Sequence, residues 1–175
     1  MWYTYRLVHA QSTLLEGSKV RQFHFAAERL LDAPTEVVYH CLRDYTAHHR
    51  HQPEGFLPAA FTRLEVLRGG VGAGTQMRFT TRMGGRSATR TQEVSEPEPG
   101  HILVESGDGE GSTFTVEPRG ARTLVRIETT LLVSGLEGVV MPLLGPRIMR
   151  GLYEDELTRL EAYAQVHAAK QVAAA

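Results

Sequence analysis

The sequence predicts an α+β fold in which an antiparallel sheet is covered by a long C-terminal helix. Three observations point to this fold. Turn residues recur at short intervals through the middle of the chain, the segments between them alternate between apolar and polar residues, and both flanks carry helical periodicity. A period of two marks strands with one buried face, and a period near 3.6 marks amphipathic helices. Because an apolar sheet face and an apolar helix stripe must cover each other, two layers follow.

The N-terminal residues fit this pattern least well. An additional strand there would use the apolar residues Trp2, Tyr3, Tyr5, Leu7 and Val8. An unstructured or oligomer-forming arm is the alternative, and the sequence leaves both open. We therefore divide the chain into an N-terminal extension at 1–21, a domain at 22–168 and a flexible tail at 169–175.

The domain is expected to open with a strand near 22–32, followed by a helix. The apolar residues of this helix recur at helical spacing, at Val37, Val38, Cys41, Leu42 and Tyr45. Asp32 or Thr35 is expected to cap the helix, because short polar side chains accept hydrogen bonds from the free N–H groups of a first turn. Pro34 is compatible with such a start.

Six further strands are expected in the middle of the chain. They are placed near 61–68, 75–83, 86–96, 101–106, 112–117 and 122–133. Gly84-Gly85 has the composition of a two-residue hairpin turn. The alternation is clearest from Gln76 to Met83 and from Thr123 to Leu131, which predicts one buried and one solvated sheet face.

A long helix is expected from about Gly138 or Pro146 to His167. Its apolar stripe comprises Met149, Leu152, Tyr153, Leu157, Leu160 and Ala164. The charged residues expected on its outer side are Arg147, Arg150, Glu154, Asp155, Arg159 and Glu161. Because proline removes a helical hydrogen bond, Pro142 and Pro146 predict a kink or a two-part start.

Composition excludes several function classes. A length of 175 residues favours one domain, and a net charge of −1 argues against a nucleic-acid or anionic-membrane partner. Because Cys41 is the single cysteine, an intramolecular disulfide and a thiolate zinc cluster are excluded. Its position on the apolar face of the first helix indicates that Cys41 serves as a small hydrophobic residue rather than as a nucleophile. We see no stretch suited to stable membrane insertion and no signal-peptide pattern, so a cytoplasmic location is expected.

Four segments carry a resemblance to a known family. They are Leu30 to Tyr39, Leu42 to Tyr45, Gly70 to Thr75 and Pro146 to Tyr163. In these segments the chain resembles the SRPBCC (START-like, Bet v 1-like) superfamily, and within it the polyketide cyclase/dehydrase group, over about 22–166. The resemblance implies a helix-grip fold, with a curved antiparallel sheet of about six to seven strands wrapped around a long C-terminal helix. It also implies an apolar cavity for lipids, polyketides or similar molecules, but no shared catalytic motif.

Three polar features invite other interpretations. The stretch Gly69 to Gly74 favours a hairpin turn over a nucleotide site, because no P-loop lysine or helix follows it. The cluster His48-His49-Arg50-His51 could bind zinc or supply a base, but adjacent residues rarely converge on one ion, so a solvated or cavity-mouth loop is favoured. The four arginines expected to form a basic patch on the solvated sheet face, or to pair with acids such as Glu93, are Arg78, Arg82, Arg86 and Arg90.

These observations favour binding of a small hydrophobic ligand in an internal cavity, with no metal, cofactor or nucleic acid. The alternative is a polyketide cyclase/aromatase or dehydratase-type enzyme that uses the same cavity, and a protein-interaction module is a third possibility. A buried histidine or carboxylate in the cavity wall would favour the enzyme. No catalytic residue is assigned, and the oligomeric state is open, a homodimer included. The expected ligand-binding residues are Tyr45, His48, His49, Met77, Phe79, Thr81, Met83, Ile102, Val104, Phe114, Val116, Val125, Ile127, Met149, Leu152 and Tyr153.

Overall fold

A computed structural model describes residues 6–14, 20–50, 54–83, 85–107 and 109–174. Eight strands and two helices follow one another in this part of the chain. Their bounds are β1 Arg6–Leu14, β2 Val20–Leu31, α1 Thr35–Arg43, β3 Phe61–Arg68, β4 Gln76–Met83, β5 Arg86–Glu98, β6 Ile102–Gly107, β7 Glu110–Arg119, β8 Arg122–Ser134 and α2 Gly135–Ala174.

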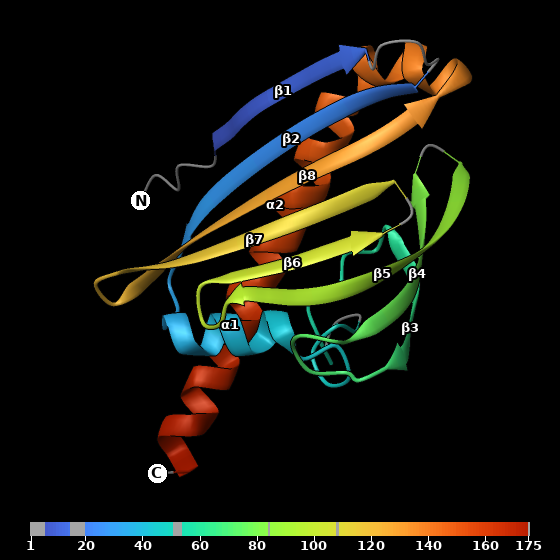
Figure 1. The fold of residues 1–175 in the computed structure, drawn as a ribbon. Coiled ribbons are helices and arrows are strands. Elements are labelled where there is room, and N and C mark those ends of the chain that lie inside the picture. The colour runs from blue at the N-terminus through green and yellow to red at the C-terminus, as the bar shows by residue number, and fades with distance from the viewer. Residues whose placement is uncertain (1–5, 15–19, 51–53, 84, 108, 175) are drawn as a thin grey trace.

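All eight strands belong to one sheet, with the order β1-β2-β8-β7-β6-β5-β4-β3. Every neighbouring pair is antiparallel. Figure 1 shows the strands curving across α2, with α1 lying across one end of the sheet. The predicted α+β helix-grip architecture is therefore confirmed. Within the described residues, neither helix is long and apolar enough to cross a membrane.

The sheet has one strand more than the six or seven expected. β1 pairs with β2 from Arg6 opposite Glu28 to Leu14 opposite Arg21. Of the two alternatives for the N-terminal residues, the strand is the one found, although Trp2, Tyr3 and Tyr5 lie outside the described residues. The strands predicted between 22 and 133 are all present, with ends that differ by a few residues.

Helix α1 buries the predicted apolar face, but the predicted cap is wrong. Pro34 occupies the N-cap position, and no side chain caps the first turn. The Thr35 hydroxyl instead lies 3.1 Å from the hydroxyl of Thr123, and the backbone N–H of Asp32 donates to Glu161. Both candidates are thus used to attach the start of α1 to β8 and α2, rather than to close the helix end.

A buried carboxylate joins α1 to the sheet. Glu96 of β5 accepts hydrogen bonds from the Tyr39 hydroxyl at 2.7 Å and from Arg43 Nε at 3.0 Å. The backbone N–H of Ala73, in the turn between β3 and β4, donates to the same carboxylate. Gly72 in that turn has φ +64°, and a Cβ there would collide with Glu96 and Arg43. The glycine-rich stretch is therefore a turn between strands, as predicted.

Helix α2 is continuous through both prolines. The helix runs from Gly135 to Ala174 with Pro142 and Pro146 inside it, so the expected two-part start is wrong. Its apolar stripe packs against β2 and β8. Glu161, expected on the outer side, is only 7% exposed, because it pairs with Arg29 of β2 at 2.6 Å and accepts the Asp32 N–H at 2.8 Å.

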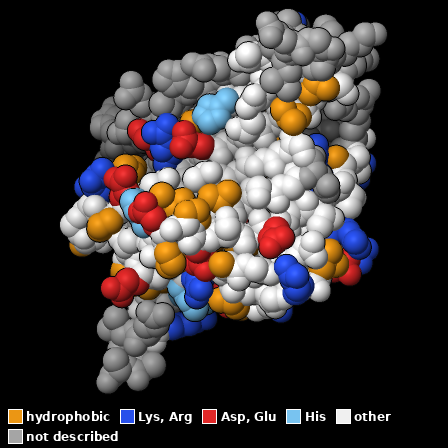
Figure 2. Space-filling model, viewed as in Figure 1, with side chains coloured by type: hydrophobic (Ala, Val, Ile, Leu, Met, Phe, Trp, Pro, Cys, Tyr) orange, Lys and Arg blue, Asp and Glu red, His pale blue; other side chains and the backbone are white. Residues whose placement is uncertain are grey.

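The four central arginines do not share one face. The register pairs Arg78 with Thr91 and Phe79 with Arg90, which places Arg90 among the inward residues of β5. Arg78 pairs with Glu65, and the side chain of Arg86 lies outside the described residues. Figure 2 shows basic and acidic side chains interspersed over this side of the molecule rather than a single basic patch. The predicted four-arginine patch is therefore wrong.

Truncation of the α2 stripe is expected to destabilise the fold. Leu157 is completely buried between α2 and the sheet, so Leu157→Ala should lower the free energy of unfolding by about 2–5 kcal/mol. Val166→Ala, at a position that is 52% exposed on the same helix, is the control and should change it by less than about 0.5 kcal/mol. Denaturant unfolding measures both, and equal losses would contradict this packing.

Candidate functional site

A cavity of about 690 Å³ lies between α2 and the inner face of the sheet. It exists because α2 packs on β2 and β8 while the sheet curves on through β7, β6, β5 and β4. Its volume falls within the range of small-molecule sites. The apolar lining residues are Phe61, Phe79, Ala88, Phe114, Ile127, Leu131, Val133, Leu144, Ile148, Met149, Leu152 and Tyr153.

Part of the predicted residue set lines this cavity. The residues that do so are Phe79, Thr81, Phe114, Ile127, Met149, Leu152 and Tyr153. The residues that lie in the core outside the lining are Tyr45, Met77, Val116 and Val125. The side chain of Met83 lies outside the described residues. The periodicity of strands β4, β7 and β8 and of helix α2 therefore found half of the apolar wall.

The prediction for β6 has the wrong parity. Leu103 is fully buried and pairs with Phe114, a cavity residue, so these two side chains share the inner face. Ile102 and Val104 alternate with Leu103 and belong to the opposite face. The inward residue next to Leu103 in this alternation is Glu105. Because the prediction assigned Ile102 and Val104 to the inner face, it assigned Glu105 to the outer face, although Glu105 lines the cavity.

The cavity has a polar wall that sequence reasoning missed. Its polar and charged members include Arg90, Gln92, Glu105, Glu110, Ser112 and Glu156. Glu105, Glu110 and Arg90 come from three adjacent strands, and Glu156 faces them from α2. The signal was present in the helix, because Glu156 follows Leu152 and Tyr153 at helical spacing on the same side.

One acid of this wall is neutralised by its neighbours. Glu110 pairs with Arg90, whose Nε lies 2.8 Å from the carboxylate. The side-chain amide of Gln92 donates to the other Glu110 oxygen at 3.0 Å. Both partners are themselves largely removed from solvent. Glu110 therefore takes part in an internal ion pair, in which Arg90 balances its charge within the cavity wall.

Glu105 is held by a single hydrogen-bond donor among the described residues. The Tyr45 hydroxyl donates to the carboxylate at 2.6 Å, and the Tyr45 ring stacks on His49. Burial raises the pKa of Glu105 to about 7, although the Tyr45 hydrogen bond favours the charged form. The negative charge of Glu110 adds to the effect of burial. Glu105 thus exchanges its proton close to neutral pH.

Glu156 has no hydrogen-bond partner among the described residues. Burial raises its pKa to about 8, and the charges of Glu105 and Asp155 act in the same direction. At neutral pH Glu156 therefore carries a proton that it can donate. The charge of Glu105 contributes to the raised pKa of Glu156, so the two carboxyl groups interact electrostatically across the cavity. This arrangement can accept a hydrogen-bond donor or move a proton inside the cavity.

Two residues of the predicted histidine cluster, His48 and His49, are buried, so the expected solvated loop is wrong at these positions. His49 Nε2 lies 2.8 Å from the Leu42 carbonyl oxygen, and burial lowers the pKa of His49 to about 4. His48 Nδ1 lies 2.9 Å from the Tyr163 hydroxyl, and burial lowers its pKa as well. Neither residue lines the cavity, and His51 lies outside the described residues.

Cys41 occupies the core, as expected. It is fully buried on α1, and burial raises the pKa of its thiol to about 12. A thiol with this pKa is almost entirely protonated at neutral pH and is a poor nucleophile. The chemistry that the site offers is therefore proton transfer by carboxyl groups.

Removal of the buried acid on α2 is expected to change the pH dependence of stability. Since the native pKa of Glu156 is raised, the native state holds a proton that the unfolded chain loses from about pH 4.5 upward. The free energy of unfolding should fall between about pH 5 and 8, because in this range the unfolded chain has lost the proton that native Glu156 retains. Glu156→Gln should reduce that fall and raise stability at pH 8 by about 1–3 kcal/mol.

The control is Glu154→Gln, on the surface of the same helix and paired with Arg150. It should leave the pH profile almost unchanged. Urea unfolding at about pH 5 and about pH 8 compares the variants. A pH profile of Glu156→Gln that coincides with that of the unsubstituted protein would show that Glu156 is not buried as described.

Comparison with solved structures gives the same architecture. The KanY protein solved in solution is 21% identical, with a TM-score of 0.67 over 80% of this chain and 95% of that one. TTHA0849 from Thermus thermophilus is 22% identical, with a TM-score of 0.64 over 82% of this chain and 98% of that one. The Zhui aromatase/cyclase from Streptomyces sp. R1128 is 15% identical, with a TM-score of 0.59 over 82% and 94%. At these identities the likeness concerns the fold.

A family model matches most of the chain. Among curated proteins, no sequence match is found. Residues 22–165 match the family described as polyketide cyclase / dehydrase and lipid transport. This range covers β2 through most of α2, and with them every strand and helix that borders the cavity. The chain therefore belongs to the polyketide cyclase/dehydrase and lipid-transport family of the SRPBCC superfamily.

Proposed function

We propose that this protein binds a small, largely apolar molecule in the cavity between α2 and the sheet. The observation that carries the proposal is the 690 Å³ space itself, because a filled core would leave no room for a ligand. Burial of ligand hydrocarbon would contribute roughly 25 cal/mol per Å² to affinity. The family description, which includes lipid transport, supports the same conclusion.

The polar wall would orient the ligand. Glu105 and Glu156 stand on opposite sides of the cavity, one on β6 and the other on α2. A hydroxyl, phenol or amine on the ligand would donate a hydrogen bond to Glu105 and so compensate for the hydration that this carboxyl group loses on burial. The opposite end of the ligand would lie among aromatic residues such as Phe61 and Phe79. The preferred ligand is thus an apolar molecule with a hydrogen-bond donor at one end.

Binding is tested with a neutral fluorescent probe, N-phenyl-1-naphthylamine, by equilibrium titration. The unsubstituted protein should give saturable binding. Ala88 lines the cavity, so Ala88→Phe should fill part of it and weaken binding more than about tenfold. Ala73→Phe, in the exposed turn between β3 and β4, is the matched control and should bind like the unsubstituted protein. Absence of saturable binding by this probe and by a panel of other neutral apolar probes would overturn the proposal.

A second candidate function is a dehydratase or cyclase reaction, and the Glu105–Glu156 pair favours it. In a dehydration, the Glu105 carboxylate would remove the proton next to a carbonyl, and protonated Glu156 would donate to the departing hydroxyl. The C–H and C–O bonds break, a C=C bond forms and water leaves. Removing either acid–base group typically costs about 10²–10⁴-fold in rate.

The enzyme candidate is tested with β-hydroxyketones of increasing chain length, by following the absorbance of the conjugated enone. The rate should rise as Glu105 loses its proton near pH 7 and fall as Glu156 loses its proton near pH 8. Glu105→Gln should lower the rate at least about 100-fold while probe binding stays within about threefold. Equal rates in Glu105→Gln and the unsubstituted protein would remove this candidate and leave ligand binding intact.

A further inference from the structure

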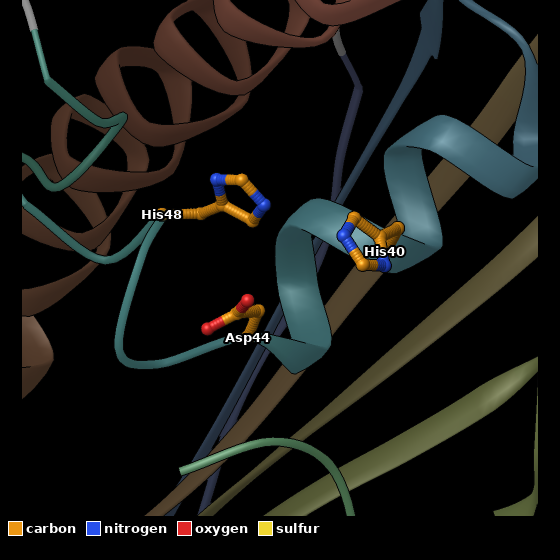
Figure 3. Close-up of side chains that lie close together, drawn as sticks. All are labelled: His40, Asp44 and His48. Atoms are coloured by element: carbon orange, nitrogen blue, oxygen red, sulfur yellow. The ribbon is translucent and has the colours of Figure 1, made fainter.

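A cluster of potential metal ligands lies at the end of α1, away from the cavity lining. His40, Asp44 and His48 are spaced four residues apart, so the first two share one face of the helix. Figure 3 shows His40 on α1, Asp44 where the helix ends and His48 in the segment that follows. One ligand atom from each residue lies within 4.8 Å of those of the other two. None of the three lines the cavity.

The atoms needed for an ion are not used by other contacts. Asp44 Oδ1 accepts hydrogen bonds from Thr46 and from the N–H of Ala47, and Oδ2 accepts none within the described part of the chain. His40 is exposed and makes no hydrogen bond among the described residues. His48 uses Nδ1 toward the Tyr163 hydroxyl, which leaves Nε2 for an ion.

The surroundings resemble those of a metal-binding histidine. Metal-ligating histidines usually hold their second ring nitrogen in a hydrogen bond that fixes the ring, and His48 does so through Tyr163. Tyr163 is fixed in turn, because its hydroxyl donates to the Glu54 carbonyl oxygen at 3.1 Å. The carboxylate of Asp44 also lies at the negative end of the α1 dipole, where a cation is favoured.

We propose that His40, Asp44 and His48 form a binding site for a divalent transition metal ion of the zinc type. Two imidazoles and one carboxylate form a ligand set that suits such borderline ions better than it suits Mg²⁺ or Ca²⁺. Ligand atoms around a tetrahedral ion lie about 3.4 Å apart, so the exposed His40 ring closes the set by rotating toward the other two. The ion would connect α1 and the following segment to α2 through Tyr163. Solvent or a ligand atom would complete its coordination.

The experiment is calorimetric titration of the untagged, chelator-treated protein with Zn²⁺, with Co²⁺ absorbance as a second readout. One equivalent should bind, Co²⁺ should give a tetrahedral spectrum, and Zn²⁺ should raise the melting temperature. His40→Ala should weaken Zn²⁺ binding more than about tenfold and abolish the thermal shift. His24→Ala removes a histidine of β2 that is paired with Glu128, and it should bind like the unsubstituted protein.

Two further variants separate coordination from folding. Asp44→Asn keeps the oxygen that accepts from Thr46 and Ala47, so it should fold normally yet lose Zn²⁺ affinity. Tyr163→Phe removes the group that orients His48 and should weaken binding by about tenfold. Equal Zn²⁺ affinity in the unsubstituted protein, His40→Ala and Asp44→Asn would overturn the proposal. Absence of binding in the unsubstituted protein, or equal binding of Mg²⁺, would do so as well.

Discussion

The attachment of α2 to one side of the sheet is the constraint on which the rest of the structure depends. Leu157, Leu160 and Ala164 are buried against the core that includes β2 and β8. Glu161 adds a polar contact at the same place, because it binds Arg29 and the backbone of Asp32. Since α2 is fixed there and the sheet curves on, some of the inner residues of β4 to β7, such as Phe79, Glu105 and Phe114, face open space. The cavity is thus a consequence of where the helix is anchored.

The polarity of the cavity wall is costly for folding and therefore informative about function. A buried carboxyl group without a cation loses hydration, and the protein accommodates Glu156 by keeping it protonated. Well-packed apolar residues at such positions are often as stable or more stable. Glu105 and Glu156 therefore fit a role toward a ligand better than a role in stability. Because both acids lie in the cavity wall, an enzymatic function is a second candidate in addition to ligand binding.

Contiguous contacts connect the cavity with the histidine cluster. The Tyr45 hydroxyl binds Glu105 in the cavity wall, and the Tyr45 ring stacks on His49 at a centroid distance of 4.2 Å. His48, the residue before His49, contacts the Tyr163 hydroxyl of α2. The same short segment after α1 thus supports the polar wall on one side and presents the proposed metal ligands on the other.

The sequence by itself determined the fold class, the strands between 22 and 133, the apolar face of α1 and much of the apolar cavity wall. These features depend on local periodicity and on turn residues, which a single chain displays directly. The tertiary structure decided which face of β6 is inward, because strand pairing with Phe114 sets the parity and brings Glu105 inside. It also decided that Glu161 is buried by Arg29 and that Asp44 lies close to two histidines. A charged residue looks the same in the sequence whether it lies on the buried or the exposed face. Only the partners that the tertiary structure brings to it show which face it occupies.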